Sequence, residues 1–363
     1  MDLRQLEPAA EWRAGDVADP EKWTLRLTDA DRSELDRALQ TAKARSSDPL
    51  EISRDDFPLD RLAPKLDLVV TELLDGRGFM RISALDVDAY SDDDLTLLYW
   101  GIGLHLGQPW AQNHYGHVLG DVTDQGKSLD DPTVRGNEIG GIALDYHTDG
   151  SDLVGLLCLR PARTGGLSCV ANAVAIHNQM VRDCPELAAA LYEELPYDTR
   201  GEEAEGTRPF YTVPGFTEQG GRLFVRFIPQ YILASQRHPD APQLSATARA
   251  AMAKMTELAN ESDFNVYMDL RPGEMQFINN YHVLHGRTAY EDDPAHGYKR
   301  HLKRLWLATY ALSDRPARFR AGGRSHWEAR RSISQLSPVD RGVGHGPKNL
   351  FRRRAPMSRA AST

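Results

Sequence analysis

The stretch GGIALDYHTDGSDLVGLLCLR, residues 140–160, combines the two patterns that decide the fold of this chain. Its second half, Leu153–Leu159, is the longest apolar run in the sequence, with one glycine inside, and is typical of a buried strand. Its first half places His147 and Asp149 two residues apart, just ahead of that strand. Side chains at i and i+2 of an extended chain point to one face, so this imidazole and this carboxylate are expected to converge.

From about residue 108 onward, the chain consists mainly of short β-rich runs separated by Gly, Pro and Asp. Two helical stretches, at about 173–192 and 245–259, interrupt these runs. Many short strands with a few inserted helices predict a sandwich or barrel rather than a parallel βαβ sheet. The predicted strands are Leu153–Leu159, Ser168–Asn172, Leu223–Ile228, Asn265–Leu270, Glu274–Ile278 and Leu305–Tyr310.

The first hundred residues instead predict helices around one short strand. Thr28 and Asp31 resemble a capping box, and apolar residues then recur at helical spacing. The helices are expected at about 28–42, 59–74 and 91–102, and the strand at 78–82. These patterns divide the chain into an N-terminal helical region packed on the barrel (1–95), a β core with helical insertions (96–315), and a basic, partly disordered C-terminal tail (316–363).

Composition excludes several classes of protein. The chain has 363 residues, a formal charge of −9 and a mean hydropathy of −0.50, which disfavour a broad nucleic-acid surface or a membrane span. Its N-terminus lacks the charged-then-apolar layout of a signal peptide. Three cysteines are too few and too scattered for a disulfide framework. We expect a cytoplasmic protein with a small-molecule partner; a homo-oligomer remains an option.

The sequence contains two His-x-Asp triplets, and only one is a good metal site. His238-Pro239-Asp240 lies in a polar stretch with two prolines, so we expect a surface loop there. His147 and Asp149 gain a partner in His285, which ends the strand-like segment 275–284. His282 lies three residues before His285, so in a strand it points to the opposite face and is not expected to be a ligand.

Two histidines and one carboxylate on one face would leave half of an octahedral metal site open. This arrangement is typical of non-haem Fe(II) oxygenases. Zinc held by the same three ligands would instead indicate a hydrolase. The ligand set alone leaves both alternatives open.

A keto-acid cosubstrate would need a cation that grips its carboxylate, ideally an arginine on a rigid strand. Arg304 opens the apolar run 305–310, and if residues 288–299 connect a hairpin, Arg304 falls opposite His285. Arg300 has the same side-chain parity but lies nearer the turn, where we expect it to be solvated. Trp306 also shares this parity and is expected to fill the barrel.

Four motifs in matching order resemble a known family. They are YHTD at 146–149, GGLS at 165–168, NYHVLHGR at 280–287 and RHLKRLW at 300–306. Together they are similar to the taurine dioxygenase-like family of Fe(II)- and 2-oxoglutarate-dependent oxygenases, which is related in fold to clavaminate synthase. The resemblance covers roughly residues 100–312 and implies a double-stranded β-helix, or jelly roll, with helical insertions.

The resemblance implies roles for five residues. His147, Asp149 and His285 would be the iron ligands, and Arg304 would bind the distal carboxylate of 2-oxoglutarate. Ser168 stands where the family usually has a threonine whose hydroxyl helps to hold that carboxylate, and serine keeps the hydroxyl. The preceding Leu167 departs from the acidic residue that is frequent in the family. Relatives that chlorinate have a small residue in place of Asp149, so halogenation is disfavoured.

Substrate contacts are less well marked. Gln112 and Asn113 precede the metal triplet and are candidates for the mouth of the barrel. Arg226 and Tyr231, near Phe224 and Phe227, could offer a cation and a hydroxyl to an acidic or amino-acid-like substrate.

The expected function is oxidation of an unactivated C–H bond of a small molecule, by hydroxylation of an amino-acid-derived or natural-product substrate. 2-Oxoglutarate would be converted to succinate and CO2 in the same reaction, with Fe(II) and O2 required. Desaturation or cyclisation by the same site, a zinc hydrolase and a metal-binding β-barrel without oxygenase activity are the alternatives.

Overall fold

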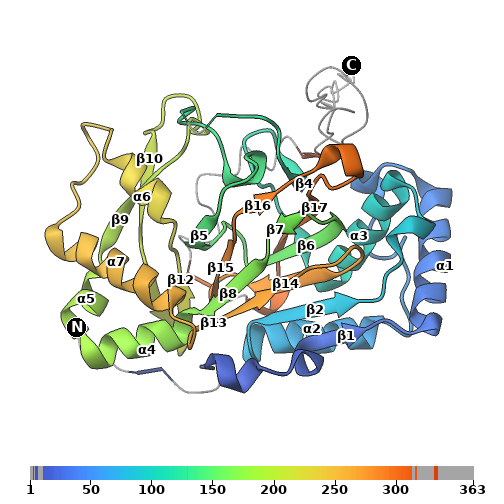
Figure 1. The fold of residues 1–363 in the computed structure, drawn as a ribbon, viewed down its shortest axis with the longest axis horizontal. Helices are drawn as coiled ribbons and strands as arrows, with labels where there is room; N and C mark the ends of the chain where they lie inside the picture. Colours follow the sequence, from blue (N-terminus) through green and yellow to red (C-terminus); the bar gives the residue numbers. More distant parts are fainter. Residues whose placement is uncertain are drawn as a thin grey trace, which may run out of the picture.

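The computed structural model describes residues 3, 5–6, 11–128, 130–312, 315–316 and 331–333. The described part is mainly β with several helices, and its strands form two main sheets (Figure 1). The larger sheet contains, in spatial order, β1 (Thr24–Arg26), β2 (Phe79–Ser83), β14 (Met275–Asn279), β6 (Leu153–Arg160), β17 (His301–Ala308), β4 (His117–Thr123) and β18 (Ser332–Ile333), with β3 (Gln108–Pro109) also paired to β17.

The smaller sheet has the order β13 (Asn265–Met268), β8 (Ser168–Asn172), β15 (Val283–Arg287) and β5 (Leu144–His147). Consecutive strands from β4 to β17 pass between the two sheets at most connections, so the chain winds through both. Three two-stranded ribbons complete the β structure: β7 (Thr164–Gly165) with β16 (Tyr290–Glu291), β9 (Glu194–Asp198) with β10 (Phe210–Pro214), and β11 (Phe216–Gln219) with β12 (Arg222–Val225).

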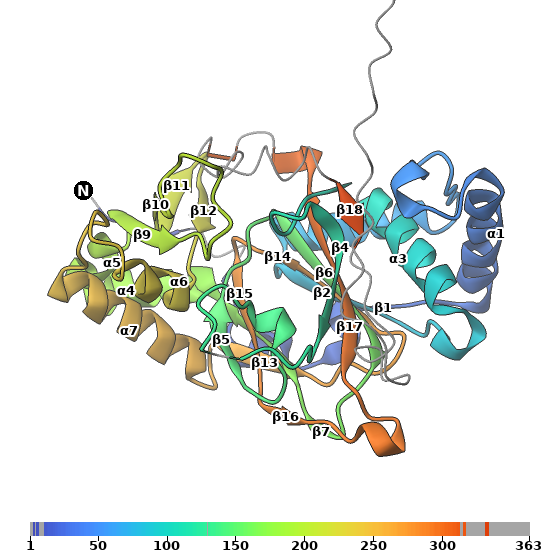
Figure 2. The same ribbon diagram turned by 90° about the horizontal axis from the view of Figure 1, so that it is seen from above.

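Helices cover the outer sides of the two sheets, as Figure 2 shows from above. On the side of the larger sheet lie α1 (Asp29–Arg45), α2 (Ala63–Asp75) and α3 (Asp92–Leu106). Beyond the smaller sheet lie α4 (Ala173–Asp183), α5 (Pro185–Ala190), α6 (Pro229–Ser235) and α7 (Ala246–Asn260). Among the described residues, no helix has both the length and the apolar character needed to cross a membrane.

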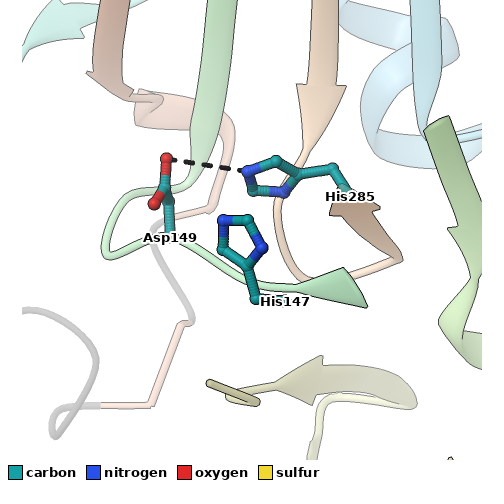
Figure 3. Close-up of side chains that lie close together, drawn as sticks. All are labelled: His147, Asp149 and His285. Carbon is teal, nitrogen blue, oxygen red and sulfur yellow. Dashed lines mark ion pairs between the residues drawn. The ribbon is translucent and has the colours of Figure 1, made fainter. Parts of the chain in front are cut away.

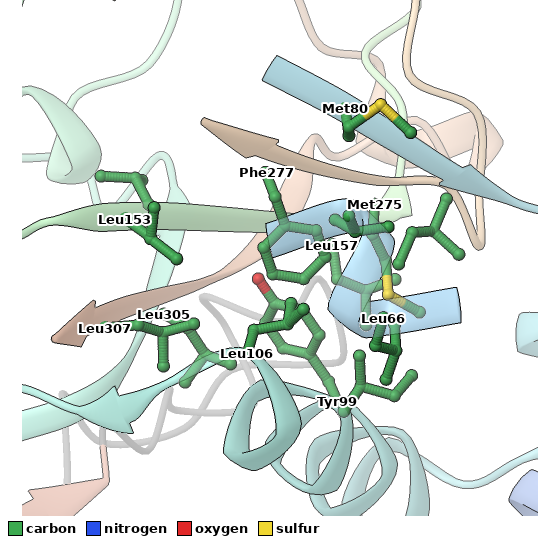
Figure 4. Close-up of a cluster of buried hydrophobic side chains, with 14 of the residues drawn as sticks. Leu66, Met80, Tyr99, Leu106, Leu153, Leu157, Met275, Phe277, Leu305 and Leu307 are labelled. Atoms are coloured by element: carbon green, nitrogen blue, oxygen red, sulfur yellow. The ribbon is translucent and has the colours of Figure 1, made fainter. Parts of the chain in front are cut away.

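One hydrophobic cluster joins the N-terminal helices to the larger sheet (Figure 4). Tyr99 of α3 packs there against Phe277 of β14, with ring centroids 6.3 Å apart. Gly155 of β6 permits this approach, because a Cβ at that position would lie 2.6 Å from atoms of both rings. Since successive side chains of a strand alternate between faces, the other face of the same strands is left free to line a cavity between the sheets.

Several predicted elements agree with the structure, including β6, β8 and the capping box at Thr28 that begins α1. The predicted helix 173–192 was wrong as a single element, because Pro185 cannot continue the hydrogen-bond pattern of α4 and a new short helix begins there. The N-terminal region contributes two strands, β1 and β2, to the larger sheet rather than one.

The strand-like segment 275–284 is also two elements rather than one. β14 ends at Asn279, the chain turns, and β15 begins at Val283 in the other sheet. His282 therefore lies in a turn, and the argument from strand parity does not apply to it.

The predicted hairpin between His285 and Arg304 was wrong. His285 pairs with His147 and Val170 in the smaller sheet, whereas Arg304 pairs with Gly120 and Leu156 in the larger sheet. The connection between the two strands is long enough to cross from one sheet to the other, so they do not lie side by side. Most of the predicted C-terminal tail, 316–363, lies outside the described residues.

Candidate metal centre and its cavity

The structure brings His147, Asp149 and His285 together at one end of the smaller sheet (Figure 3). One ligand atom from each of these residues lies within 4.8 Å of the others. The imidazole rings of the two histidines have centroids 4.3 Å apart, and His285 Nε2 lies 3.7 Å from Asp149 Oδ2. Sequence analysis singled out these three residues, and they are the only such group of His, Cys, Asp or Glu among the described residues.

His147 is held in an orientation that suits a metal ligand. Its Nδ1 lies 2.7 Å from the carbonyl oxygen of Asp145, so Nδ1 carries the proton and donates, and the lone pair of Nε2 stays free. Burial, followed by the neighbouring His285, lowers the pKa of His147 to about 4. The ring is therefore neutral at pH 7, as metal binding requires.

Asp149 lies just beyond the end of β5, so strand geometry alone does not orient it. Instead, the side chain of Asn280 fixes its backbone: Asn280 Oδ1 accepts from the Asp149 N–H at 2.8 Å, and Nδ2 donates to the Asp149 carbonyl at 2.7 Å. Arg226 donates to the same carbonyl. Sequence reasoning missed Asn280, although it opens the NYHVLHGR motif.

Two donors from β17 hold the carboxylate of Asp149. Trp306 Nε1 donates to Oδ2 at 2.8 Å, and Arg304 Nη1 donates to the same oxygen at 3.3 Å. Burial alone would raise the pKa of Asp149, but the Arg304 guanidinium, followed by His285, holds it well below its ordinary value. The carboxylate is thus ionised, and the site presents two imidazoles and one anion. Trp306, expected only to fill the barrel, is part of the site.

A cavity of about 460 Å³ opens beside the three residues. Arg300, just before β17, lines it, as do Leu302, Arg304 and Trp306 of β17 and Ser168 of β8. The Ser168 hydroxyl donates to Gln276 Oε1, while Gln276 Nε2 is buried and has no partner among the described residues.

The two candidate arginines, Arg300 just before β17 and Arg304 within it, occupy different environments. Arg304 lies beside the candidate metal-ligand group (His147, Asp149 and His285), because its Nη1 contacts Asp149. Its Nε also donates to Gln112 Oε1 at 2.8 Å. Arg300 was expected to be solvated, which was wrong, because it is only 5% exposed. Its Nη2 donates to the Gly166 carbonyl at 3.3 Å, and its buried Nη1 has no partner among the described residues.

The four candidate substrate contacts separate into two pairs. Arg226 and Tyr231 line the cavity. Gln112 is buried and bonded to Arg304 through both the Arg304 side chain and its carbonyl, and it is not among the residues that line the cavity. Asn113 does not line it either, and its amide contacts His117.

The second triplet, 238–240, lies in a turn, and none of its described contacts involves His147, Asp149 or His285. His238 Nε2 lies 2.8 Å from Oδ2 of the buried Asp198, which also accepts from Arg237. His238 thus has a structural role that its sequence context does not reveal.

We expect Asp240→Ala to leave activity within about twofold of the wild type, because no interaction of this side chain holds the site. His238→Ala should lower the free energy of unfolding by about 1–2 kcal/mol, since it removes one hydrogen bond to the buried side chain of Asp198. Denaturant unfolding and succinate formation measure the two effects. A large loss of activity in folded Asp240→Ala would mean that this triplet, and not 147–149, serves the metal.

Comparison with known proteins finds a matching family model and related sequences. The model of the family "Taurine catabolism dioxygenase TauD, TfdA family" matches residues 37–306. FR-33289 synthase of Streptomyces rubellomurinus is 29% identical over 299 residues, covering 82% of this chain and 88% of that protein. Taurine hydroxylase-like protein SAT17 of Stachybotrys chartarum is 25% identical over 310 residues, covering 83% and 79%.

Solved structures share the fold at lower identity. The non-haem iron oxygenase OrfP, in complex with Fe and α-ketoglutaric acid, aligns with a TM-score of 0.59 and 19% identity, over 79% of this chain and 94% of its own. An asparagine oxygenase in complex with Fe(II), 3-hydroxyasparagine and succinate aligns with a TM-score of 0.58 and 17% identity over the same shares. The family match spans most of the chain, and the chain belongs to the TauD/TfdA family as a non-haem iron dioxygenase that uses Fe(II), 2-oxoglutarate and O2.

Proposed function

We propose that this dioxygenase hydroxylates an unactivated C–H bond of a small, amino-acid-derived or natural-product substrate and converts 2-oxoglutarate to succinate and CO2. The observation that carries the proposal is the convergence of two imidazoles and one carboxylate within 4.8 Å, beside a cavity. Related structures support the substrate class: a variant of OrfP was solved with (3S)-hydroxy-L-Arg, and the asparagine oxygenase with 3-hydroxyasparagine. Desaturation or cyclisation would use the same residues.

His147, Asp149 and His285 are the proposed iron ligands. The donor set fits Fe(II), because two imidazoles and one ionised carboxylate leave the remaining positions of an octahedron for other ligands. When bound, iron with 2-oxoglutarate and O2 supplies the oxidising chemistry. The residues of the chain orient the ligands, hold the cosubstrate and keep water away from the reacting C–H bond.

Ser168 is the proposed hydroxyl donor to the distal carboxylate of 2-oxoglutarate. In the present arrangement its proton is directed to Gln276 Oε1. If the Gln276 amide is turned over, its Nε2, otherwise without a partner among the described residues, donates to Ser168 Oγ. The Ser168 proton is then free for a carboxylate.

Arg300 and Arg304 are the two candidates for the cationic anchor of that carboxylate. The sequence predicts Arg304, and this assignment stays a prediction. Geometry favours Arg300, because Arg304 already contacts the proposed iron ligand Asp149, whereas the far carboxylate of 2-oxoglutarate must lie away from the metal. The two Cα atoms are four residues apart along β17 and the residue that precedes it, about 13 Å at about 3.3 Å per residue. Arg300 is also the arginine that lies near Ser168, through Gly166.

The finer fold and location are also proposals. The strand orders β4-β17-β6-β14 and β5-β15-β8-β13 support a double-stranded β-helix, in which residues 96–315 form the oxygenase core and residues 1–95 pack on it. All three cysteines are free, which supports a reducing, cytoplasmic environment.

Anaerobic titration of the protein with Fe(II) and 2-oxoglutarate tests the proposal without knowledge of the substrate. We expect a weak visible charge-transfer band that needs both additions, followed by succinate formation when O2 is admitted. A protein that retains zinc, gives no band and hydrolyses esters or amides would instead be a hydrolase. Absence of both the band and any turnover would favour a binding protein.

We expect Trp306→Phe to weaken Fe(II) binding by about tenfold, because it removes the indole N–H that holds Asp149 Oδ2 and keeps an aromatic ring in place. Trp110→Phe is the matched control, since Trp110 does not line the cavity. Anaerobic Fe(II) titrations at saturating 2-oxoglutarate measure both affinities. Equal affinities in the Trp306 variant and the wild type would contradict a positioning role for the indole.

A further inference from the structure

The residue that follows Arg226 is hydrogen-bonded to residues 147–149, here called the metal-ligand segment, and this holds Arg226 beside that segment. The neighbouring Phe227 N–H donates to Thr148 Oγ1 at 2.9 Å, and its carbonyl accepts from the Thr148 N–H at 2.7 Å. Thr148 lies between the two proposed ligands of the YHTD motif. The Arg226 side chain then donates to the carbonyl of Asp149, so its position is coupled directly to the metal centre.

The guanidinium of Arg226 is buried without an anionic partner. The residue is 8% exposed and lines the cavity. Among the described residues, no carboxylate lies within ion-pair distance of it, and its hydrogen bonds go to the Asp149 carbonyl and the Tyr211 hydroxyl. A buried cation without a counter-ion is unfavourable, and the remaining N–H groups of its fork are available for a planar or tetrahedral anion.

Tyr211 supplies a second donor at the same place. Its hydroxyl accepts from Arg226 Nη2 at 2.6 Å, so its own proton is free to donate to another acceptor. The ring is held by stacking on Tyr197, with centroids 5.3 Å apart and planes at 11°. Tyr211 also lines the cavity, so the free proton and the guanidinium can serve one ligand.

The charges that line the cavity suit a second anion in addition to the cosubstrate. Seven arginines and five carboxylates line it, and of these seven arginines only Arg135 and Arg304 form an ion pair with a described residue. Two of the unpaired arginines, Arg287 and Arg300, lie at the Ser168 end, where the distal carboxylate of 2-oxoglutarate is proposed to bind. Arg226 is bonded to the metal-ligand segment instead and is left for another anion.

Building on the proposed function, we infer that Arg226 and Tyr211 form a subsite for an anionic group of the substrate, a carboxylate, sulfonate or phosphonate. An anion seated there is adjacent to Asp149, which places the C–H bond to be oxidised a few bonds from the anionic group. Compounds that carry only a neutral or cationic group at this position should bind poorly, because they leave the buried guanidinium unpaired.

The test uses the protein loaded anaerobically with Fe(II) and saturating 2-oxoglutarate, which occupies the cosubstrate end. Acetate, methanesulfonate and methylphosphonate are the probes, with acetamide as the neutral control. Relaxation of the probe's methyl protons by the iron reports both binding and closeness to the metal. We expect saturable relaxation with at least one anion and little with acetamide; the order of the three anions identifies the preferred head group.

Three variants connect binding to the subsite. Arg226→Gln should raise the dissociation constant of the bound anion at least about tenfold, and Tyr211→Phe about threefold. Arg208→Gln is the matched control, because Arg208 lines the same cavity but is exposed, and it should change affinity less than twofold. The charge-transfer band is recorded for each variant. If Arg226→Gln loses the band, Tyr211→Phe decides, because in the described structure Tyr211 is hydrogen-bonded to Arg226 and not to Asp149.

Unchanged affinity in both subsite variants, equal binding of acetamide, or no anion binding by the wild type would overturn the inference. The proposed function fails separately, when the wild type forms no charge-transfer band at all.

Discussion

Replacing His285 with alanine is expected to lower Fe(II) affinity by more than about hundredfold and to abolish 2-oxoglutarate turnover at modest iron concentration. The reason is that His147 and Asp149 alone would hold the metal with two ligands, and even residues that only orient metal ligands cost 10–100-fold when removed. His147→Ala should behave in the same way. Anaerobic Fe(II) titration, and succinate formed after O2 is admitted, measure the two effects.

His282→Ala is the matched control for this prediction. It makes the same imidazole-to-methyl change at a buried residue three positions away, outside the metal-ligand group. Its cost should appear in the free energy of unfolding and not in metal affinity. Full oxygen consumption by folded His285→Ala at modest iron would remove this histidine from the metal site.

The second large effect concerns Arg300. We expect Arg300→Lys to raise the 2-oxoglutarate concentration needed for half-maximal turnover at least about tenfold. A buried fork-to-carboxylate contact is worth about 2–5 kcal/mol on truncation, and lysine cannot reproduce its two parallel hydrogen bonds. Iron content should change little, because Arg300 does not contact the metal-ligand group in the described structure.

Arg304→Lys is the paired variant. It should act through the metal centre, by weakening the hold on Asp149 Oδ2, and therefore lower iron affinity more than it shifts the 2-oxoglutarate requirement. Paired 2-oxoglutarate titrations at saturating iron, scored by succinate, separate the two. If Arg304→Lys gives the large shift and Arg300→Lys does not, the prediction from sequence is right and Arg304 anchors the distal carboxylate.

Sequence was sufficient for features that are encoded locally. The apolar run that became β6, and the alternation that turns Arg304 and Trp306 to the same side of β17, are short-range patterns that a strand obeys wherever it lies. The His147–Asp149 triplet and His285 were identified by residue type and order, and the three residues meet in the structure.

Tertiary structure decided what depends on pairing between distant segments. The strands of His285 and Arg304 lie in different sheets, and no local periodicity states whether a connection forms a hairpin or crosses between sheets. That crossing turns Arg304 toward Asp149. The burial of Arg300 could not be predicted from the sequence either, because it depends on neighbours brought from other parts of the chain.

Within the site itself, the orientation of Asp149 also depends on tertiary structure. The sequence determined that a carboxylate stands two residues after a histidine, but β5 ends at His147, so strand geometry does not aim that carboxylate. Asn280, Trp306 and Arg226 orient it, from three segments that are between 77 and 157 residues away along the chain. The residue types and order of the proposed ligands can be read from the sequence, whereas their geometry depends on contacts that only folding creates.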